Sequence, residues 1–211
     1  MKESMHERIM NGKLFTDMCE GMPEERTQAK LRMKAFNDPR ADDIEKRLAI
    51  QKEMLLEGQD AWIEPPFYFC YGTHIRLGKG VYLNFNCNFV DDGMIIVGEN
   101  TMFGPAVTIA TVGHPLRPDM RPYMYTAPVT VGKNCWIGEN VTICPGVTIG
   151  DNSVIGAGAV VTKDIPAGVI AFGNPCRVFR EIGEHDMAFY YKDRRITEED
   201  LAEMHALEAQ G

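Results

Sequence analysis

The chain has 211 residues, of which 20 are glycine and 12 are proline, and its formal net charge is -8. A chain of this length can bury a substantial core. Its acidity argues against a nucleic-acid partner, because nucleic-acid affinity depends on neutralising phosphates. No apolar run approaches the ~20 residues that span a bilayer, and the first residues lack the apolar stretch of a signal peptide. We therefore expect a cytoplasmic protein with no membrane partner.

Three segments of the chain differ in composition. Residues 1–60 contain 24 charged residues, whereas residues 61–182 contain 17 charged residues together with 15 of the glycines and 10 of the prolines. Residues 183–211 carry a net charge of -5. We expect these segments to be an N-terminal helical segment, a central β domain and a C-terminal helical tail. None of the six cysteines belongs to a C-x-x-C pair, so reduced, packed thiols are expected.

The N-terminal segment has the start and stop signals of helices. Ser4 and Glu7 have capping-box spacing, which predicts a short helix that ends near Gly12. Pro23, followed by two glutamates, predicts the start of a second helix. Apolar residues then recur at helical spacing, first at Ala29, Met33 and Phe36, and then at Ile44, Leu48 and Leu55. This segment is expected to cover one end of the central domain.

The central segment repeats every six residues. Six aliphatic residues follow one another at this interval: Val131, Ile137, Ile143, Ile149, Ile155 and Val161. The same register occurs earlier in two runs: Leu77, Leu83 and Phe89, then Val97, Phe103 and Ile109. Two residues are inserted between these runs, and a loop at about 110–128 interrupts the array.

A period of six fits neither a helix nor a free strand, but it fits short strands joined by tight corners. If three hexads form one triangular coil, a coil uses ~18 residues and stacked coils lie about 4.8 Å apart. The aliphatic residues would then point inward, and glycine and asparagine would occupy the corners. The repeat therefore predicts a mainly β protein with a parallel β-helix over residues 61–182.

These features and several local motifs resemble the hexapeptide-repeat acyltransferases, and most closely the galactoside and maltose O-acetyltransferases. The matching stretches are 12–21 (GKLFTDMCEG), 84–86 (NFN), 90–92 (VDD), 113–115 (GHP), 136–138 (WIG), 161–166 (VTKDIP) and 173–177 (GNPCR). The resemblance implies the left-handed form of the β-helix. It also implies acetyl transfer from acetyl-CoA to a sugar hydroxyl, by a homotrimer with active sites between subunits and without a metal.

Histidine is the side chain best suited to remove the acceptor's proton, because its ordinary pKa lies near neutral pH. His114 lies in the loop that interrupts the repeat, and long loops in a rigid array often carry function. The resemblance makes His114 the general base. The other histidines are interpreted as solvated or have no identifiable partner: His6, His74, His185 and His205.

The resemblance also assigns the acceptor side of the site. Asn84 would stabilise the oxyanion or hold the acceptor, in the way amide donors serve acyl transfer. Asp92 and Asp17 would accept hydrogen bonds from sugar hydroxyls, and Met124 would lie beside the acceptor. Cys70 stands where the family has a sugar-binding serine, and a thiol is a weaker donor. A covalent acetyl-Cys70 intermediate is the alternative interpretation of this residue.

For acetyl-CoA, Trp136 is expected to face outward and stack on part of the cofactor. Further cofactor contacts are implied by the resemblance at Glu139, Ala157, Thr162, Lys163, Arg177 and Arg180. The three basic residues among them would bind the phosphates of CoA. Glu139 replaces a serine of the family, which matters little if that contact is made by the main chain.

Three other functions remain open at this stage. The same fold could acetylate another acceptor, such as an antibiotic hydroxyl or an amine. It could be a metal hydratase like the γ-class carbonic anhydrases, although that chemistry requires three histidine ligands and the array has only His74 and His114 nearby. It could also be a scaffold without catalysis. The tail has an N-cap signal at Thr197 and Asp200, and its role is not indicated by the sequence.

Overall fold

The computed structural model describes residues 3–19, 21–38 and 43–209. The chain divides into one unit that ends at Arg180 and a second that begins at Glu181, and each is described by itself.

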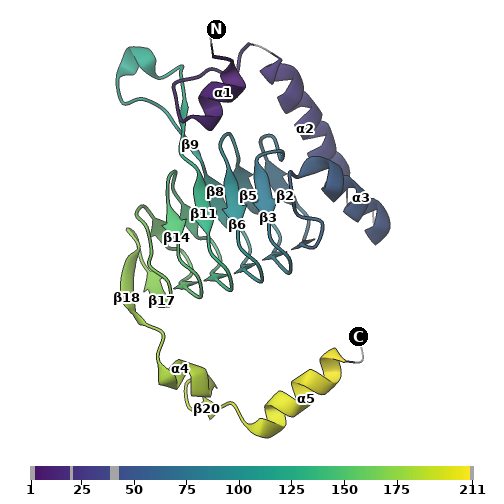
Figure 1. The fold of residues 1–211 in the computed structure, drawn as a ribbon, viewed down its shortest axis with the longest axis vertical. Helices are drawn as coiled ribbons and strands as arrows, with labels where there is room; N and C mark the ends of the chain where they lie inside the picture. The colour runs from purple at the N-terminus through teal and green to yellow at the C-terminus, as the bar shows by residue number, and fades with distance from the viewer. Residues whose placement is uncertain (1–2, 20, 39–42, 210–211) are drawn as a thin grey trace. The chain divides into compact units, whose positions relative to one another are not determined.

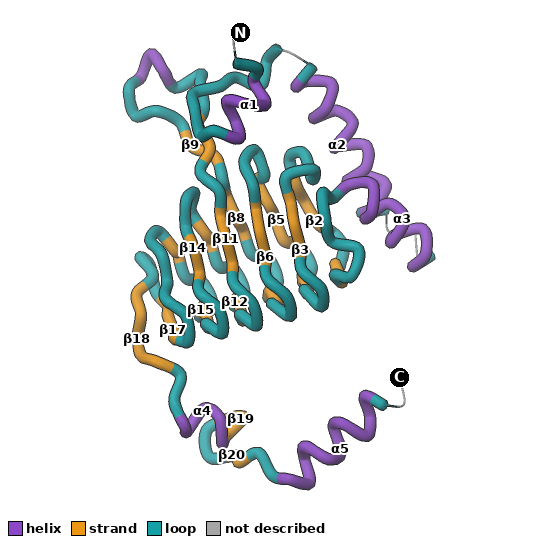
Figure 2. Tube along the Cα trace, viewed as in Figure 1, coloured by secondary structure: helices purple, strands orange, loops and turns teal. Residues whose placement is uncertain are grey.

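Stacked strands of the described chain form the three faces of a parallel β-helix (Figures 1 and 2). The seven-stranded face contains, in spatial order, β1 (Trp62–Ile63), β4 (Tyr82–Leu83), β7 (Met102–Phe103), β12 (Trp136–Ile137), β15 (Val154–Ile155), β17 (Val169–Phe172) and β18 (Arg177–Glu181). The five-stranded face contains β2 (Phe67–Phe69), β5 (Cys87–Val90), β8 (Thr108–Ala110), β13 (Thr142–Ile143) and β16 (Val160–Val161). The four-stranded face contains β3 (Ile75–Leu77), β6 (Ile95–Val97), β11 (Val129–Val131) and β14 (Thr148–Ile149).

Strand pairing confirms the six-residue period. Ile137 pairs with Ile155, and Ile143 pairs with Val161, so each first-position residue lies beside the one three hexads later. These side chains are buried in one continuous core with the aliphatic residues of the earlier runs. Burial of one such side chain is worth about 1.5–3 kcal/mol, and the coils are held together by the sum of these contributions.

The corners explain the glycines and asparagines of the repeat. Asn134, Asn140 and Asn152 have φ values of 52°, 55° and 59°, in the left-handed region that asparagine tolerates better than most residues. At Gly138 an added Cβ would lie 2.6 Å from the backbone nitrogen of Ala157 in the next coil. Glycine is therefore required there by the close approach of two coils.

Three helices precede the β-helix: α1 (Met5–Met10), α2 (Met22–Phe36) and α3 (Ile44–Met54). The capping box of Ser4 and Glu7 is present, and Ala29 and Phe36 of α2 are buried as the spacing predicts. The apolar stripe predicted around α3 is confirmed only in part, because Leu55 is buried in the core and Leu48 is half-buried. Ile44 is 49% exposed and Leu55 lies just past the helix end. The helix itself buries Met54 and Gln51, and the Gln51 amide donates to the carbonyls of Gly58 and Ala61, which ties the helix to the chain that follows.

The loop that interrupts the repeat leaves the β-helix after β8. It contains β9 (Val112–Gly113), a 3-10 turn η1 (Pro118–Met120) and β10 (Tyr125–Thr126), and β9 and β10 pair in antiparallel register. The N-terminal segment is tied to it by a bridge between Phe15 and Met124. Figure 1 shows this loop and α1 over the same side of the stacked coils, above the strands in this view.

The second unit contains α4 (Glu184–Ala188), a hairpin of β19 (Phe189–Tyr191) and β20 (Arg194–Arg195), and α5 (Glu198–Glu208). The predicted cap of α5 is confirmed, because the side chains of Thr197 and Asp200 each bond to the other's backbone nitrogen. The hairpin was not predicted from the sequence. Among the described helices of the whole chain, none is long and apolar enough to cross a membrane.

The stacked core makes one stability prediction. Ile143→Ala removes a fully buried side chain from the middle of the coils and should lower the free energy of unfolding by about 2–5 kcal/mol. Thr142→Ala, on the adjacent half-exposed position of β13, is the matched control and should change it by much less. Urea unfolding followed by circular dichroism measures both. Equal effects of the two substitutions would contradict the inward stacking of the first-position residues.

Candidate active site

Seven of the predicted site residues and the loop that carries His114 lie at two of the three corners of the β-helix. We call the corner that follows the five-stranded face the histidine edge; it contains Cys70, Asp92, Thr162, Lys163 and the start of the loop that carries His114. We call the corner that follows the seven-stranded face the asparagine edge; it contains Asn84, Glu139 and Ala157. Along both edges, the residues predicted to bind the acceptor lie on the early coils, and those predicted to bind the cofactor lie on the later coils.

One chain does not bring the two edges together. They are separated by the width of the five-stranded face, which β5 crosses with four residues, from Cys87 to Val90. A strand rises about 3.3 Å per residue, so the edges lie on the order of 13 Å apart or more. Asn84 and Asp92, at the two ends of this strand, therefore cannot hold the same small substrate from one chain.

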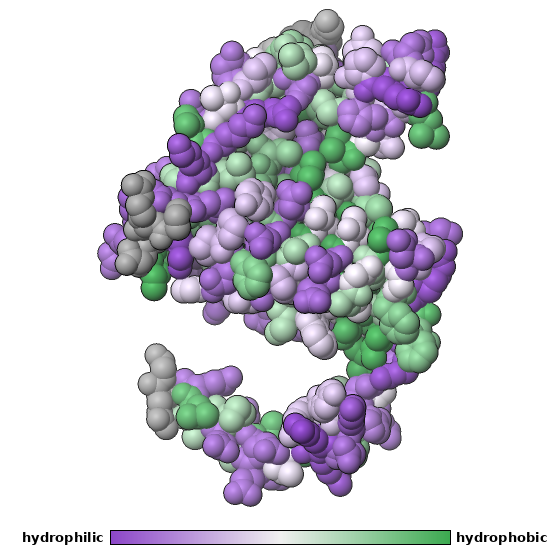
Figure 3. Space-filling model, turned by 180° about the vertical axis from the view of Figure 1, so that it is seen from behind, coloured by the Kyte–Doolittle hydropathy of each residue, from purple (hydrophilic) through white to green (hydrophobic). Residues whose placement is uncertain are grey.

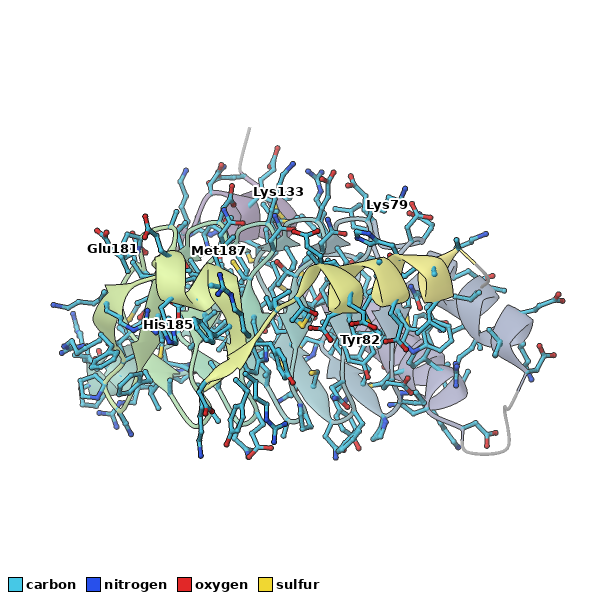
Figure 4. All side chains as sticks on the ribbon, turned by 90° about the horizontal axis from the view of Figure 1, so that it is seen from below. Lys79, Tyr82, Lys133, Glu181, His185 and Met187 are labelled. Atoms are coloured by element: carbon cyan, nitrogen blue, oxygen red, sulfur yellow. The ribbon has the colours of Figure 1, made fainter. Side chains whose placement is uncertain are left out.

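The third corner carries none of the predicted site residues. Lys79 and Lys133 mark it in Figure 4, seen from below. There the Lys133 ammonium lies 3.3 Å from the carboxylate of Glu99 in the preceding coil. This corner is a solvated ladder of opposite charges, which contributes little to stability.

His114 is held by two backbone carbonyls of its own loop. Its Nδ1 lies 2.8 Å from the carbonyl oxygen of Arg121 and 3.1 Å from that of Tyr123. Carbonyl oxygens only accept hydrogen bonds, so in the neutral ring Nδ1 carries the hydrogen and Nε2 has a free lone pair. This is the arrangement that a general base requires.

Asn84 has its amide oriented in a similar way. Its Oδ1 accepts a hydrogen bond of 2.9 Å from the backbone nitrogen of Phe85. Because that nitrogen is a donor, the bonded side-chain atom must be the oxygen, and the amide nitrogen keeps its two N–H groups for another partner. The asparagine edge thus presents a hydrogen-bond donor.

On the histidine edge the predicted acceptor residues do come together. Asp17 forms an ion pair with Arg26 of α2, and the charge of Arg26 also acts on the buried carboxylate of Asp92. Burial raises the pKa of Asp92, and Arg26 opposes this shift. Arg26 was not predicted as a site residue, because its position on α2 gives no sign of the partner that lies nine residues earlier in the chain.

Cys70 and Met124 line the same cluster. Both pack, half-buried, against the apolar group formed by Ile9, Phe15, Met22 and Tyr71. The Asp92 carboxylate is near enough to the Cys70 thiol to raise the pKa of that thiol. Burial, with the two neighbouring aspartates, raises the pKa of Cys70 to about 12. A thiol that stays protonated is a poor nucleophile, which counts against the covalent alternative for this residue.

Asp91 is a second residue that the sequence did not single out. Its carboxylate is fully buried and accepts hydrogen bonds from the backbone nitrogens of Cys70, Tyr71 and Gly72, at 2.7, 3.0 and 2.6 Å. Burial raises the pKa of Asp91 to about 7, and the three backbone donors oppose that shift. No sequence signal could have distinguished Asp91 from Asp92, because the two neighbours differ only in the direction in which the corner turns them.

A groove of about 460 Å³ runs along the asparagine edge over three successive coils. It is lined by Gly104, Pro105, Trp136, Gly138, Glu139, Val154, Ile155, Gly156 and Ala157. Trp136 is 57% exposed, so its ring faces outward as expected. The groove is mostly apolar with main-chain groups at its glycines, which suits a long flexible chain with amide groups.

The remaining predicted cofactor residues lie at the C-terminal end of the β-helix. Lys163 is exposed on the histidine edge, one coil from the end. Arg177 and Arg180 are in β18, the outermost strand of the seven-stranded face. Figure 3 shows apolar side chains gathered at this end, where the rings of Phe172 and Phe179 lie 5.1 Å apart. Within the described residues, no group of three His, Cys, Asp or Glu side chains could hold a metal ion.

Comparison with known proteins agrees with this architecture. A model described as the maltose acetyltransferase hexapeptide capping motif matches residues 8–56, and one described as the bacterial transferase hexapeptide matches residues 128–163. A galactoside O-acetyltransferase of Escherichia coli K12 is 51% identical over 199 residues, which cover 93% of this chain and 98% of that protein.

Solved structures give the same result. A galactoside acetyltransferase in complex with coenzyme A has a TM-score of 0.89 and 50% identity, covering 93% of this chain and 100% of that one. A maltose O-acetyltransferase from Clostridium difficile 630 has a TM-score of 0.83 and 40% identity, covering 86% and 98% of the two chains.

The fold and the two edges define a hexapeptide-repeat acyltransferase. Within that class, the chain belongs to the family of galactoside and maltose O-acetyltransferases, which makes it an acetyl-CoA-dependent enzyme.

The protonated thiol of Cys70 leads to a prediction that distinguishes direct acetyl transfer from transfer through a covalent intermediate. Cys70→Ser should keep at least about a third of the turnover number, because a buried protonated thiol is not the nucleophile. The acceptor KM should stay equal or fall, since a hydroxyl is the better donor. Steady-state kinetics with acetyl-CoA and a sugar measure both values. Loss of more than about a hundredfold in turnover, in a folded variant, would restore the covalent alternative.

Proposed function

We propose that the protein transfers the acetyl group of acetyl-CoA to a hydroxyl of a galactoside, maltose or glucose type of sugar, by direct attack in a ternary complex. The observation that carries this proposal is the fixed tautomer of His114 in a loop that lies over a cluster of acceptor carboxylates. The printed names of the relatives support the same acceptor class.

In this mechanism His114 acts as the general base. Its Nε2 takes the proton of the acceptor hydroxyl while the hydroxyl oxygen attacks the thioester carbonyl. The two carbonyls that hold Nδ1 also stabilise the imidazolium that forms, because a charged donor makes a stronger hydrogen bond. The same proton then passes to the sulfur of CoA as the carbon–sulfur bond breaks, so the ring returns to its starting state.

Asn84 completes the site from the asparagine edge. Its free N–H groups would donate to the oxygen that gains negative charge in the tetrahedral intermediate. Removal of one such donor costs about a hundred- to a thousandfold in turnover in other acyl-transfer enzymes. This role requires the asparagine edge of one subunit to face the histidine edge of another.

The acceptor would lie on the early coils of the histidine edge. The carboxylates of Asp17 and Asp92 can each accept hydrogen bonds from sugar hydroxyls, and the guanidinium of Arg26 keeps positive charge next to both. Met124 and Cys70 provide apolar surface for a sugar ring. A polar neutral acceptor suits this pair of anions, whereas an anionic acceptor would be repelled.

Acetyl-CoA would lie along the later coils, with its flexible arm in the groove beside Trp136. Ala157 and Glu139 would contribute through the main chain, and Thr162 from the opposite edge. Lys163, Arg177 and Arg180 supply the positive charge that the phosphates of CoA require. The thioester would then point toward the early coils, where the acceptor binds.

A homotrimer would bring the two edges together, because the histidine edge of one subunit would face the asparagine edge of the next. A ring of three identical subunits forms three equal interfaces, each with one histidine edge and one asparagine edge. The width of the five-stranded face supports this assembly, because it keeps the histidine edge and the asparagine edge of one chain apart.

An acceptor panel tests the function, with galactosides, glucose, maltose and chloramphenicol as acceptors. At least one sugar should cause release of CoA thiol from acetyl-CoA above the rate without acceptor. His114→Ala should lower that turnover by about a hundred- to ten-thousandfold, with the acetyl-CoA KM unchanged, because only the proton transfer is lost.

His205→Ala, in the exposed tail helix, is the control and should leave turnover unchanged. Thiol release with no sugar in the panel would refute the sugar assignment, and release with chloramphenicol alone would favour an antibiotic acceptor. Undiminished turnover of the His114→Ala variant would exclude His114 as the general base.

A further inference from the structure

The corner that carries Cys70 is built around one buried carboxylate. Asp91 has no exposed surface, and its two oxygens accept all three successive backbone N–H groups of residues 70–72. A buried carboxylate is expensive unless such donors compensate it. An arrangement in which three consecutive amides point at one side chain fixes the path of that turn.

His74 closes the same corner from the other side. Its Nδ1 lies 2.8 Å from the backbone carbonyl of Asp91, so this nitrogen is the donor. Burial lowers the pKa of His74, which keeps the ring neutral. The ring also lies 5.2 Å from that of Tyr71. The turn is therefore bonded to Asp91 at two places. The backbone of residues 70–72 bonds to the Asp91 carboxylate, and the ring of His74 bonds to the Asp91 backbone carbonyl.

Other aspartates of the β-helix bond to turns in a weaker way. Asp151 accepts one hydrogen bond, of 2.8 Å, from the backbone nitrogen of Lys133, and Asp164 accepts one of 2.8 Å from that of Thr148. Both of these side chains lie in exposed turns. Asp91 differs in that it is buried, bonds to three amides and is adjacent to the acceptor cluster.

We propose that Asp91 is the positioning residue of the acceptor site, fixing Cys70 and Asp92 relative to one another. Asp92 follows Asp91 in the chain, and Cys70 is the first residue that the Asp91 carboxylate holds. The two side chains that meet in the cluster are thus joined through one rigid group. This inference rests on the proposed function, because it assigns a role within the same acceptor site.

The substitution Asp91→Asn tests this role. Asparagine keeps the size of the side chain but offers one acceptor oxygen, and its amide nitrogen would face a backbone N–H group. The acceptor KM should rise at least about tenfold, because hydrogen bonds to a charged group are lost at the turn. The acetyl-CoA KM should stay within about twofold, since the cofactor residues lie on later coils.

Asp151→Asn is the matched control, since it removes a turn aspartate remote from the acceptor cluster, and both of its KM values should stay within about twofold. A merely structural role of Asp91 would lower the folded fraction, which reduces apparent turnover but leaves both KM values unchanged. That result, with an acceptor KM within about twofold of the wild-type value, would overturn the proposal.

A second variant keeps the proposal testable if Asp91→Asn does not fold. His74→Phe retains a ring against Tyr71 but loses the hydrogen bond to the Asp91 carbonyl, and it should raise the acceptor KM about threefold with the acetyl-CoA KM unchanged. An unchanged acceptor KM in this variant would also overturn the proposal. The wild-type protein is assayed alongside with the best sugar of the panel. Failure of the wild-type protein with every sugar would refute the proposed function instead.

Discussion

The stacking of one coil on the next is the interaction on which the rest of the structure depends. First-position aliphatic residues pair three hexads apart, and this pairing places every corner directly above the corner of the preceding coil. Residues that are far apart in the chain therefore form columns at fixed intervals of about 4.8 Å. Most of the proposed site residues fall in two of these columns, with the proposed acceptor residues on the early coils and the proposed cofactor residues on the later coils.

The same geometry keeps the two edges of one chain apart. The five-stranded face separates Asn84 from the loop that carries His114, and this separation is the basis of the proposal that each site is shared by two subunits. The excursion loop and the N-terminal segment contribute to the histidine edge through the Phe15–Met124 bridge and the Asp17–Arg26 ion pair. The proposed roles use groups that the structure orients: the free Nε2 of His114, the amide N–H groups of Asn84 on the other edge, and the turn at Cys70 that bonds to Asp91.

Much of this could be predicted from the sequence because the hexads are a periodic signal with one geometric solution. The coils, the corners and the loop around His114 followed from it, and the local motifs pointed to the family. The stripe predicted around α3 holds at Leu55 and fails at Ile44, and the buried Gln51 bonds to two backbone carbonyls where the sequence pattern shows no apolar residue. Arg26 and Asp91 were missed, since their importance lies in contacts between segments that no local pattern encodes. The predicted roles of the individual site residues are still proposals.

Mixing two inactive variants tests the shared site most directly. Asn84→Ala and His114→Ala, co-expressed with different tags and purified as mixed assemblies, are each defective in only one edge. Every mixed trimer contains one interface in three with both residues intact, so the purified mixed assemblies should have about a third of the wild-type activity. Mixed assemblies that are no more active than either variant alone would contradict an active site built from two subunits.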